Sequence, residues 1–292
     1  MRKKLRGNLC FSIISFCLLL LYVLCILVPM GWGAINSLKA ELDYSFNPVG
    51  LPQTDLGGWQ FSNYYVAWKL FYVTIETDAG GLRNVEFFEL LFNSLVYGIS
   101  STFISLFSHI IMSYVCCKYK CGYTEFIYKM VIVVISIPVI GNLASEIQVS
   151  KALGVYDNLF GICIMKGGFF TMYFLIFFAT FSGVPDAYRE AATIDGAGHW
   201  SVLLKIILPM VMPTVFAVGM LQFISYWNEY YTAMVYLPSS PTIGYALYLF
   251  ERNPIKYNTI PVRLAASFFV AMPLMVIAIV FRKKIIDRKS VV

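Results

Sequence analysis

The sequence predicts an all-α membrane protein with six transmembrane helices, because the chain is strongly apolar and its apolar residues gather into six long runs. Hydrophobic residues account for 59% of the 292 residues and charged residues for only 13%, against roughly 25% charged residues in soluble domains. The mean hydropathy is +0.72. A helix that crosses a bilayer needs roughly 17 to 25 residues that are mostly apolar. Runs of about that length cover residues 9–30, 92–117, 126–144, 159–181, 207–231 and 262–281.

The basic residues predict that both termini are cytoplasmic, because Lys and Arg beside a span tend to stay inside the cell. With the N-terminus inside, fourteen basic residues lie on the cytoplasmic side of the spans and eight lie outside. The same topology places residues 182–206, between the fourth and fifth runs, inside the cell. We attribute the net charge of +6 to these anchors at the ends of spans, and not to a nucleic-acid-binding surface.

The first run follows the basic segment MRKKLRGN and is predicted to be an uncleaved span. It is longer than the roughly 7 to 15 apolar residues of a secretory signal peptide and lacks a clear cleavage site. Residues 32–88 follow it as an external cap segment, which is too long for a simple connector and rich in turn residues. Within the cap segment, the apolar and aromatic stretch from Tyr64 to Ile75 is expected to form a helix on the membrane surface.

Seven cysteines lie in or beside the spans and are expected to act as small apolar packing residues. A disulfide framework is not expected, since most of them fall in the cytoplasmic half of the spans. Cys117 and Cys121 have no His or second thiol pair at the spacing of metal ligands. His109 is expected to be a packed polar residue and not a metal ligand.

The fourth run is interrupted at Lys166-Gly167-Gly168. A lysine near the bilayer midplane costs roughly 2.5 to 3.5 kcal/mol on insertion scales, so it should face protein or water. Two interpretations are open. Either Lys166 lines a substrate path at a broken helix, or Asp157 to Lys166 is a short external helix and the span begins near Gly168.

Between the fourth and fifth runs the sequence reads EAATIDGAGHWSVLLKIILPMVMP, a polar turn between two very apolar stretches. This spacing resembles the EAA loop of binding-protein-dependent ABC importer permeases. The resemblance implies that residues 182–206 contain a cytoplasmic coupling helix, which sits in a cleft of a separate ATPase subunit. The residues that it assigns to ATPase coupling are Glu190, Ala191, Ala192, Asp195, Gly196, Ile206, Leu208 and Pro209.

The residues of this loop also favour a helix of about eleven residues on physical grounds. Pro185 suits a first helical position, and Gly196 suits the left-handed position just past a helix end. Asp186 and Glu190 lie in the first half, where the helix dipole favours carboxylates. A second amphipathic piece begins near His199 and joins the loop to the fifth span. The residues expected on one partner-facing side of the helix are Tyr188, Ala191, Ala192 and Asp195.

Further matches lie at Asn93-Ser94, at Val184-Pro185, from Ile194 to Ala197 and at Trp227-Asn228-Glu229. Together they are similar to carbohydrate-uptake permeases, in particular the MalG-like member of a two-permease pair, over roughly residues 88–285. The resemblance implies a multi-pass permease of the bacterial inner membrane that imports an oligosaccharide or glycoside by alternating access.

The partners that the resemblance implies are a second permease subunit, two copies of a cytoplasmic ABC ATPase and an extracellular or periplasmic solute-binding protein. ATP and Mg would bind to the ATPase, so no cofactor is expected in this chain. The resemblance also suggests that the cap segment contacts the second permease or the binding protein, and that the last external loop, residues 238–260, touches the binding protein. The alternative is that the cap segment only covers the membrane interface and contacts neither partner.

Sugar sites combine aromatic faces with hydrogen-bonding groups, and the outer half of the fifth run offers both. The candidate substrate-path residues are Gln222, Tyr226, Trp227, Asn228 and Glu229, together with Lys166. Alternatively, Trp227, Tyr230 and Tyr231 form an aromatic belt at the membrane interface.

Enzyme motifs do not occur in the chain. GxxxxGK[ST], HExxH and GxSxG are all missing, so ATP hydrolysis is expected in another chain and the protein is not predicted to be an enzyme. A permease for amino acids, peptides or phosphate is the alternative, because such importers carry the same loop. An ion-coupled transporter is less favoured, since it should need inverted repeats or intramembrane carboxylates beyond Glu229 and Glu146. The 292 residues are expected to form a single domain.

Overall fold

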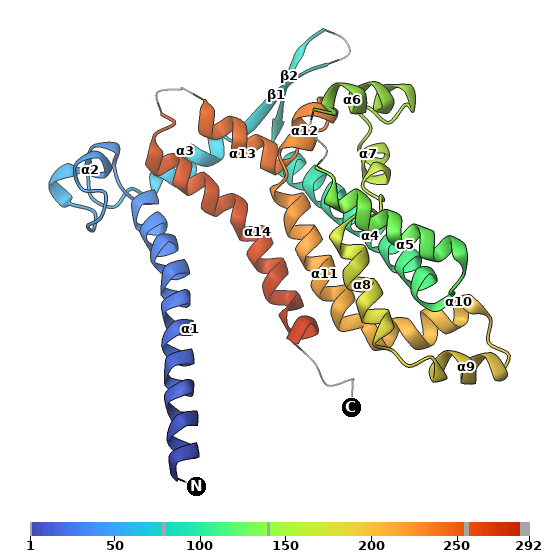
Figure 1. The fold of residues 1–292 in the computed structure, drawn as a ribbon. Coiled ribbons are helices and arrows are strands. Elements are labelled where there is room, and N and C mark those ends of the chain that lie inside the picture. The colour runs from blue at the N-terminus through green and yellow to red at the C-terminus, as the bar shows by residue number, and fades with distance from the viewer. Residues whose placement is uncertain (1, 78–79, 139–140, 254–256, 287–292) are drawn as a thin grey trace. The chain divides into compact units, whose positions relative to one another are not determined.

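A computed structural model describes residues 2–77, 80–138, 141–253 and 257–286, with side chains described between Phe11 and Val280 (Figure 1). The described chain divides into two compact units. One unit contains residues 1–71 and 250–271, and the other contains residues 72–249 and 272–292. This division does not test the single-domain prediction, and each unit is considered by itself.

The first unit contains the long helix α1 (Arg2–Ser37), the short helices α2 (Glu41–Phe46) and α3 (Ser62–Leu70), and the 3-10 turn η1 (Thr54–Leu56). Polar contacts order the cap segment after α1. The Asn63 amide donates to the backbone carbonyls of Ser37 and Lys39 at 2.9 and 2.8 Å. The buried Asp43 carboxylate accepts the backbone N–H of Gln53 at 3.0 Å. The cap segment is therefore folded and not a loose connector.

The prediction of one helix from Tyr64 to Ile75 is wrong in its second half. Helix α3 ends at Leu70, and Tyr72–Glu76 forms strand β1, which pairs antiparallel with β2 (Leu82–Glu86). β-branched residues favour a strand, and Val73 faces Val85 across this hairpin with both side chains buried. The hairpin is also a departure from the all-α prediction.

The second unit continues with α4 (Phe87–Lys118), α5 (Gly122–Ser136), α6 (Leu143–Ala152), α7 (Leu159–Met165) and α8 (Met172–Ser182). It then contains α9 (Ala187–Ile194), α10 (His199–Val202), the π-helical turn η2 (Leu203–Ile207), α11 (Leu208–Asn228) and α12 (Tyr231–Tyr236). Helices α13 (Ile243–Arg252) and α14 (Ile260–Ile286) each run across the boundary between the two units. Helix α13 lies inside the loop 238–260 that the sequence predicts to be external.

Four helical stretches of the described chain are long and apolar enough to cross a membrane: residues 11–37, 87–118, 199–228 and 260–280. The third and fourth predicted spans are shorter than expected. Helix α5 ends before Pro138, which lacks a backbone N–H and restricts the residue before it. The fourth run is divided into α7 and α8, the latter with 11 residues. The protein is thus a mostly helical membrane protein, and the count of six spans stays a prediction.

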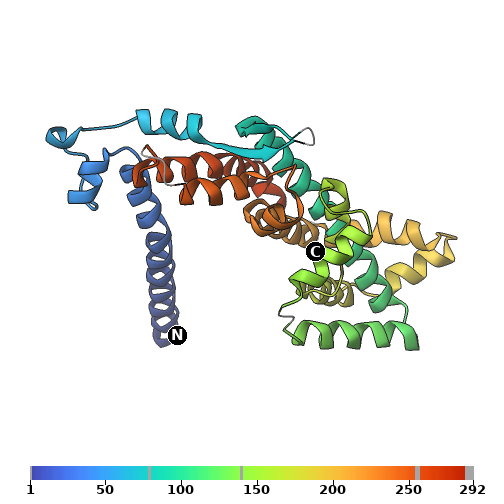
Figure 2. The same cartoon turned by 90° about the horizontal axis from the view of Figure 1, so that it is seen from above.

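Helix α4 is the central element of the second unit and packs against α8 and α11 (Figure 1, Figure 2). From α8, Phe174, Phe177 and Phe181 are completely buried. Helix α4 contributes a stripe of buried polar residues at four-residue steps, namely Ser101, Ser105, His109 and Ser113. The His109 ring contacts the Ser105 carbonyl at 2.6 Å and the Thr171 hydroxyl, which confirms it as a packed polar residue. Figure 1 shows α9 and α10 at one end of these helices, and α6 and α12 at the other.

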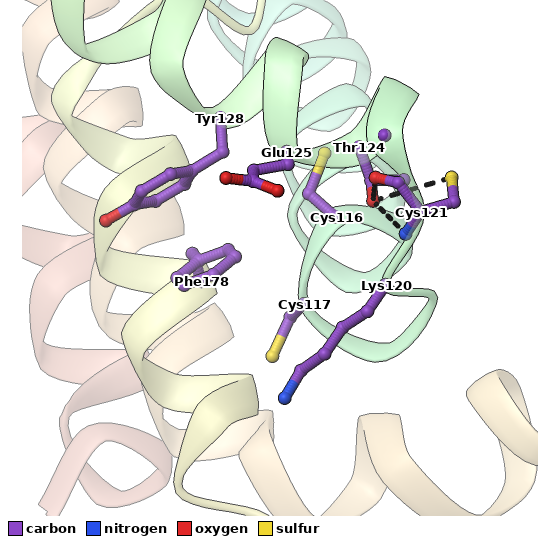
Figure 3. A pocket seen from close by; sticks show the side chains of 9 residues that line it. Cys116, Cys117, Lys120, Cys121, Thr124, Glu125, Tyr128 and Phe178 are labelled. Atoms are coloured by element: carbon purple, nitrogen blue, oxygen red, sulfur yellow. Dashed lines mark hydrogen bonds between the residues drawn. The ribbon is translucent and has the colours of Figure 1, made fainter.

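The cysteines divide into buried and exposed residues. Cys116, Cys117 and Cys163 are buried, as expected for packing residues. Cys121 is exposed and caps α5, where its backbone N–H donates to the Thr124 hydroxyl at 3.0 Å, so its predicted packing role is wrong. In Figure 3 the thiols of Cys116, Cys117 and Cys121 point in different directions around a pocket that Tyr128 and Phe178 also line. Cys17 and Cys25 are exposed on α1, and the side chain of Cys10 lies outside the described residues.

Candidate functional site

The EAA-like segment forms a short helix that ends at the predicted glycine. Helix α9 runs from Ala187 to Ile194, eight residues in place of about eleven. It begins two residues later than predicted, because the first helical residue is Ala187 and not Pro185. Gly196 has a φ of +81°, so the left-handed turn predicted there is confirmed. The backbone N–H of Ala197 bonds to the Ala192 carbonyl at 2.9 Å and completes the turn.

The predicted partner-facing side of α9 is partly wrong. Ala192 is buried in one hydrophobic cluster with Val184, Val202 and Leu203, whereas Ala191 is exposed. Neighbouring residues point about 100° apart around a helix, so the two alanines do not share a narrow face. Ala192 therefore attaches α9 to the helix bundle.

The exposed side of the segment is more apolar than the motif suggests. Ile194 is 86% exposed and Trp200 is 60% exposed, and Tyr188 and Leu204 are also among the exposed side chains. The Glu190 side chain is 65% exposed and lies 3.9 Å from Arg189. Ile194 and Trp200 were missing from the predicted site, although large apolar residues inside an otherwise polar loop are a signal visible in the sequence.

The segment continues into α11 without a break, as predicted, through α10 and η2. In η2 the backbone N–H of Leu208 bonds to the carbonyl of Leu203, five residues back. The next residue, Pro209, has no N–H to donate, so the regular hydrogen-bond ladder is interrupted where this wider turn occurs. Ile206 and Leu208 pack against the core, and Pro209 is exposed. Their part in ATPase coupling stays a prediction.

The end of α4 contacts both sides of α9. The Lys118 ammonium donates to the Val184 carbonyl at 2.6 Å and to the Asp186 carboxylate at 2.9 Å. Its side chain is only 4% exposed, whereas that of Asp186 is 53% exposed. The hydrogen bond and the charge of Lys118 hold the pKa of Asp186 below its usual range. Beyond α9, the Tyr119 hydroxyl lies 2.7 Å from Nδ1 of His199.

A second polar cluster lies at the other end of the bundle and joins three of the predicted path residues. The Lys166 ammonium, at the end of α7, lies 3.0 Å from Glu229 Oε1, at the end of α11. The same ammonium donates to Thr232 Oγ1 at 3.0 Å. The Tyr97 hydroxyl of α4 donates to Glu229 Oε2 at 2.8 Å. Lys166 also lies 5.9 Å from the ring centre of Tyr226. We call Tyr97, Lys166, Tyr226, Glu229 and Thr232 the charged cluster.

The charged cluster bears on the two interpretations of Lys166. Helix α7 is short and separate, and α8 begins only at Met172, as the interpretation with a short helix requires. The position of α7 on the external side of the membrane stays a prediction. Lys166 also lines a cavity of about 260 Å³ together with Glu146, Thr232 and Tyr236. Its charge thus faces protein groups and a small polar cavity.

The other candidate path residues lie elsewhere. Gln222 is buried and donates to the Ser105 hydroxyl at 3.1 Å. Trp227 is buried, which does not fit a belt of aromatic residues at the membrane interface, and its part in a substrate path stays a prediction. Asn228 is exposed and donates to the Ile224 carbonyl. Tyr230, a member of the alternative aromatic belt predicted from the sequence, stacks on Tyr248 with ring centres 4.3 Å apart.

Sequence reasoning missed Tyr97 as a partner of Glu229. A signal for it exists, because polar residues recur at four-residue steps along α4 and mark the helix face that meets α8 and α11. These residues are Asn93, Tyr97, Ser101, Ser105, His109 and Ser113.

Residues 87–288 match the family described as "Binding-protein-dependent transport system inner membrane component". A similar curated protein is the diacetylchitobiose uptake system permease protein NgcG of Streptomyces coelicolor. It is 27% identical over 94% of this chain and 86% of its own length. Another is the sulfoquinovosyl glycerol transport system permease protein SmoH of Agrobacterium fabrum, 21% identical over 89% of this chain and 86% of its own length.

The fold is also found among solved structures. One of them is a crystal structure of a bacterial ABC transporter involved in the import of the acidic polysaccharide alginate. The matched chain has a TM-score of 0.71 and 22% sequence identity, with 95% of this chain and 97% of that chain covered. At this identity the likeness establishes the architecture and not the substrate.

Proposed function

The chain belongs to the family of binding-protein-dependent transport system inner membrane components, and on that premise we propose that it moves a sugar, as an oligosaccharide or glycoside, into the cell. As a member of this family it is a multi-pass transport subunit of the inner membrane and not an enzyme. The observation that carries the sugar proposal is the likeness to NgcG along 94% of the chain. We expect alternating access driven by a separate ATPase.

We propose that α9 is the coupling helix and that it docks in the ATPase from the cytoplasm, in a chain with six spans and both termini inside. Support comes from the exposed apolar side chains of Ile194 and Trp200 and from the exposed carboxylate of Glu190 in the same segment. Large exposed apolar groups at the polar end of a membrane bundle are typical of a protein contact. Gly196 follows the end of this eight-residue helix, so the docking surface is short.

We propose that the charged cluster belongs to the substrate path. Tyr226 and the neighbouring Tyr236 offer aromatic faces, while Lys166, Thr232 and Glu146 offer hydrogen-bonding groups around the cavity. This mixture suits a sugar, whose ring presents C–H patches and hydroxyls together. Glu229 is paired with Lys166, which argues against an ion-coupled transporter that uses a lone carboxylate.

The test is reconstitution of the chain with its second permease, ATPase and binding protein in proteoliposomes. We expect the ATPase to co-purify with the tagged chain and a panel of labelled oligosaccharides to show ATP-dependent uptake of at least one member. A cysteine placed at Ile194 should cross-link to the ATPase, and one placed at the matched exposed position Phe107 on α4 should not. Uptake of amino acids, peptides or phosphate in place of sugars would favour the non-sugar importer.

A further inference from the structure

Lys118, the last residue of α4, and Tyr119, which follows it, hold both ends of residues 184–199, which we call the coupling segment. On the entry side, Lys118 bonds to the carbonyl of Val184 and the carboxylate of Asp186, which directly precedes α9. On the exit side, Tyr119 bonds to His199, the first residue of α10. Lys118, the last residue of α4, and Tyr119, the residue that follows the helix, therefore bracket the whole of α9.

The entry contact is built around a buried cation. The Lys118 side chain is 4% exposed, and a buried ammonium is stable only when its charge and its N–H groups are compensated. Val184 is itself buried in the cluster that contains Ala192. The carbonyl and the carboxylate that compensate Lys118 thus lie in the turn through which α8 leads into α9. Any displacement of α9 moves these two acceptors relative to the ammonium.

Helix α4 is suited to pass such a displacement on. It is one uninterrupted helix of 32 residues, about 48 Å long at about 1.5 Å per residue. At its other end the Asn93 amide donates to the Pro241 carbonyl at 3.1 Å, and the Ser94 hydroxyl accepts the Ile243 N–H at 2.6 Å. Tyr97 donates to Glu229 in the charged cluster. The same helix therefore contacts the coupling segment and the charged cluster.

We propose that Lys118 and Tyr119 form an inner clamp through which movement of α9 reaches α4, in addition to the direct route from α10 into α11. Lys118 is a positioning residue in this device, since it acts on α9 and touches neither sugar nor nucleotide. The proposal rests on the proposed function of α9 as the ATPase-docking helix. It adds a second mechanical connection that the EAA-like segment does not contain.

The experiment uses the complete transporter in proteoliposomes and compares four variants. Lys118→Met keeps the length and removes the charge, Lys118→Arg keeps the charge, and Tyr119→Phe removes only the hydroxyl. Lys120→Met is the matched control, because this exposed lysine two residues away has no hydrogen bond to the coupling segment among the described contacts. The readouts are sugar uptake, ATP hydrolysis, the KM for sugar and the amount of ATPase retained by the purified chain.

We expect Lys118→Met to retain the ATPase and to hydrolyse ATP, while sugar moved per ATP falls by about fivefold. Lys118→Arg should restore most of that ratio, and Tyr119→Phe should lower it by about twofold. The KM for sugar should stay unchanged, and Lys120→Met should match the wild type. A rescue by Arg is not expected if Lys118 only fills space.

If both Lys118→Met and Tyr119→Phe move as much sugar per ATP as a normally transporting wild type, the inner clamp is overturned and the proposed function of the chain still stands. Proportional loss of transport, hydrolysis and retained ATPase in these two variants also overturns it, because that pattern shows a general folding role. If the wild-type chain retains no ATPase, the proposed function fails and the inner clamp fails with it.

Discussion

Replacing Lys166 with Met removes the cation from the charged cluster and leaves the Glu229 carboxylate with only two hydroxyl donors, Tyr97 and Thr232. The side chains of Lys166 and Glu229 are 26% and 27% exposed. The energetic cost of breaking their ion pair should therefore lie between the costs measured for buried and for exposed pairs. Breaking a fully buried ion pair costs about 3 to 5 kcal/mol, and losing an exposed pair costs about 0 to 1 kcal/mol. We therefore expect Lys166→Met to lower the free energy of unfolding by about 2 kcal/mol.

The assay is a thermal melt of the purified chain in detergent, carried out as a double-mutant cycle. Lys166→Met and Glu229→Gln should each lower the melting temperature by about 5 °C. The double variant should lose less than the sum of the single losses, by about 1 to 2 kcal/mol, because neither charge is then left alone. Single losses that add to within about 0.5 kcal/mol would show that the two residues do not interact and would refute this reasoning.

Three further predictions follow from the geometry of the second unit. The Gly196→Leu variant should insert into the membrane and fold, since no atom lies within 4 Å of the added Cβ. The positive φ at this position strains the leucine backbone by about 1 kcal/mol. We expect the variant to uncouple transport from ATP hydrolysis. Unchanged substrate-stimulated hydrolysis would contradict this. The lowered pKa of Asp186 means that its pair with Lys118 stabilises the fold fully above about pH 4 and is lost as the pH falls through the lowered value. The difference in melting temperature between wild type and Asp186→Asn should accordingly be constant at neutral pH and shrink in acid. Phe177→Ala leaves a cavity at a fully buried position and should lower the free energy of unfolding by about 3 to 5 kcal/mol. Phe107→Ala, at an exposed position, should leave the melting temperature almost unchanged. Equal losses in the two variants would contradict the packing described.

Much of the helical organisation was predictable because apolar length is a local property. The first, second, fifth and sixth runs each coincide with a helical stretch long enough to cross a membrane. The third and fourth runs were predicted too long, although Pro138 and the pair Gly167-Gly168 mark where their helices are interrupted. The hairpin at 72–86 was missed because a short alternating segment beside aromatic residues does not distinguish a strand from a surface helix.

The candidate site was predictable to a similar degree. The turn at Gly196 was predictable because a left-handed residue after a helix is a backbone requirement of that position alone. The orientation of Ala192 was not, since the buried side of α9 depends on where Val184 and Leu203 of other elements lie. Lys166 and Glu229 were both suspected from their cost in a membrane, but 63 residues separate them and no local pattern pairs them.

The sequence by itself determined that this chain is a membrane permease and that helix α9 ends just before Gly196, because apolar run length, motif spacing and the need for a glycine at a positive φ are all local. Only the tertiary structure decided which charges meet. Lys118 pairs with Asp186, and Lys166 pairs with Glu229, because the packing of α4, α8 and α11 brings distant segments together. A cation removed from water is stable only when acceptors compensate its charge, and the fold decides which acceptors lie close enough.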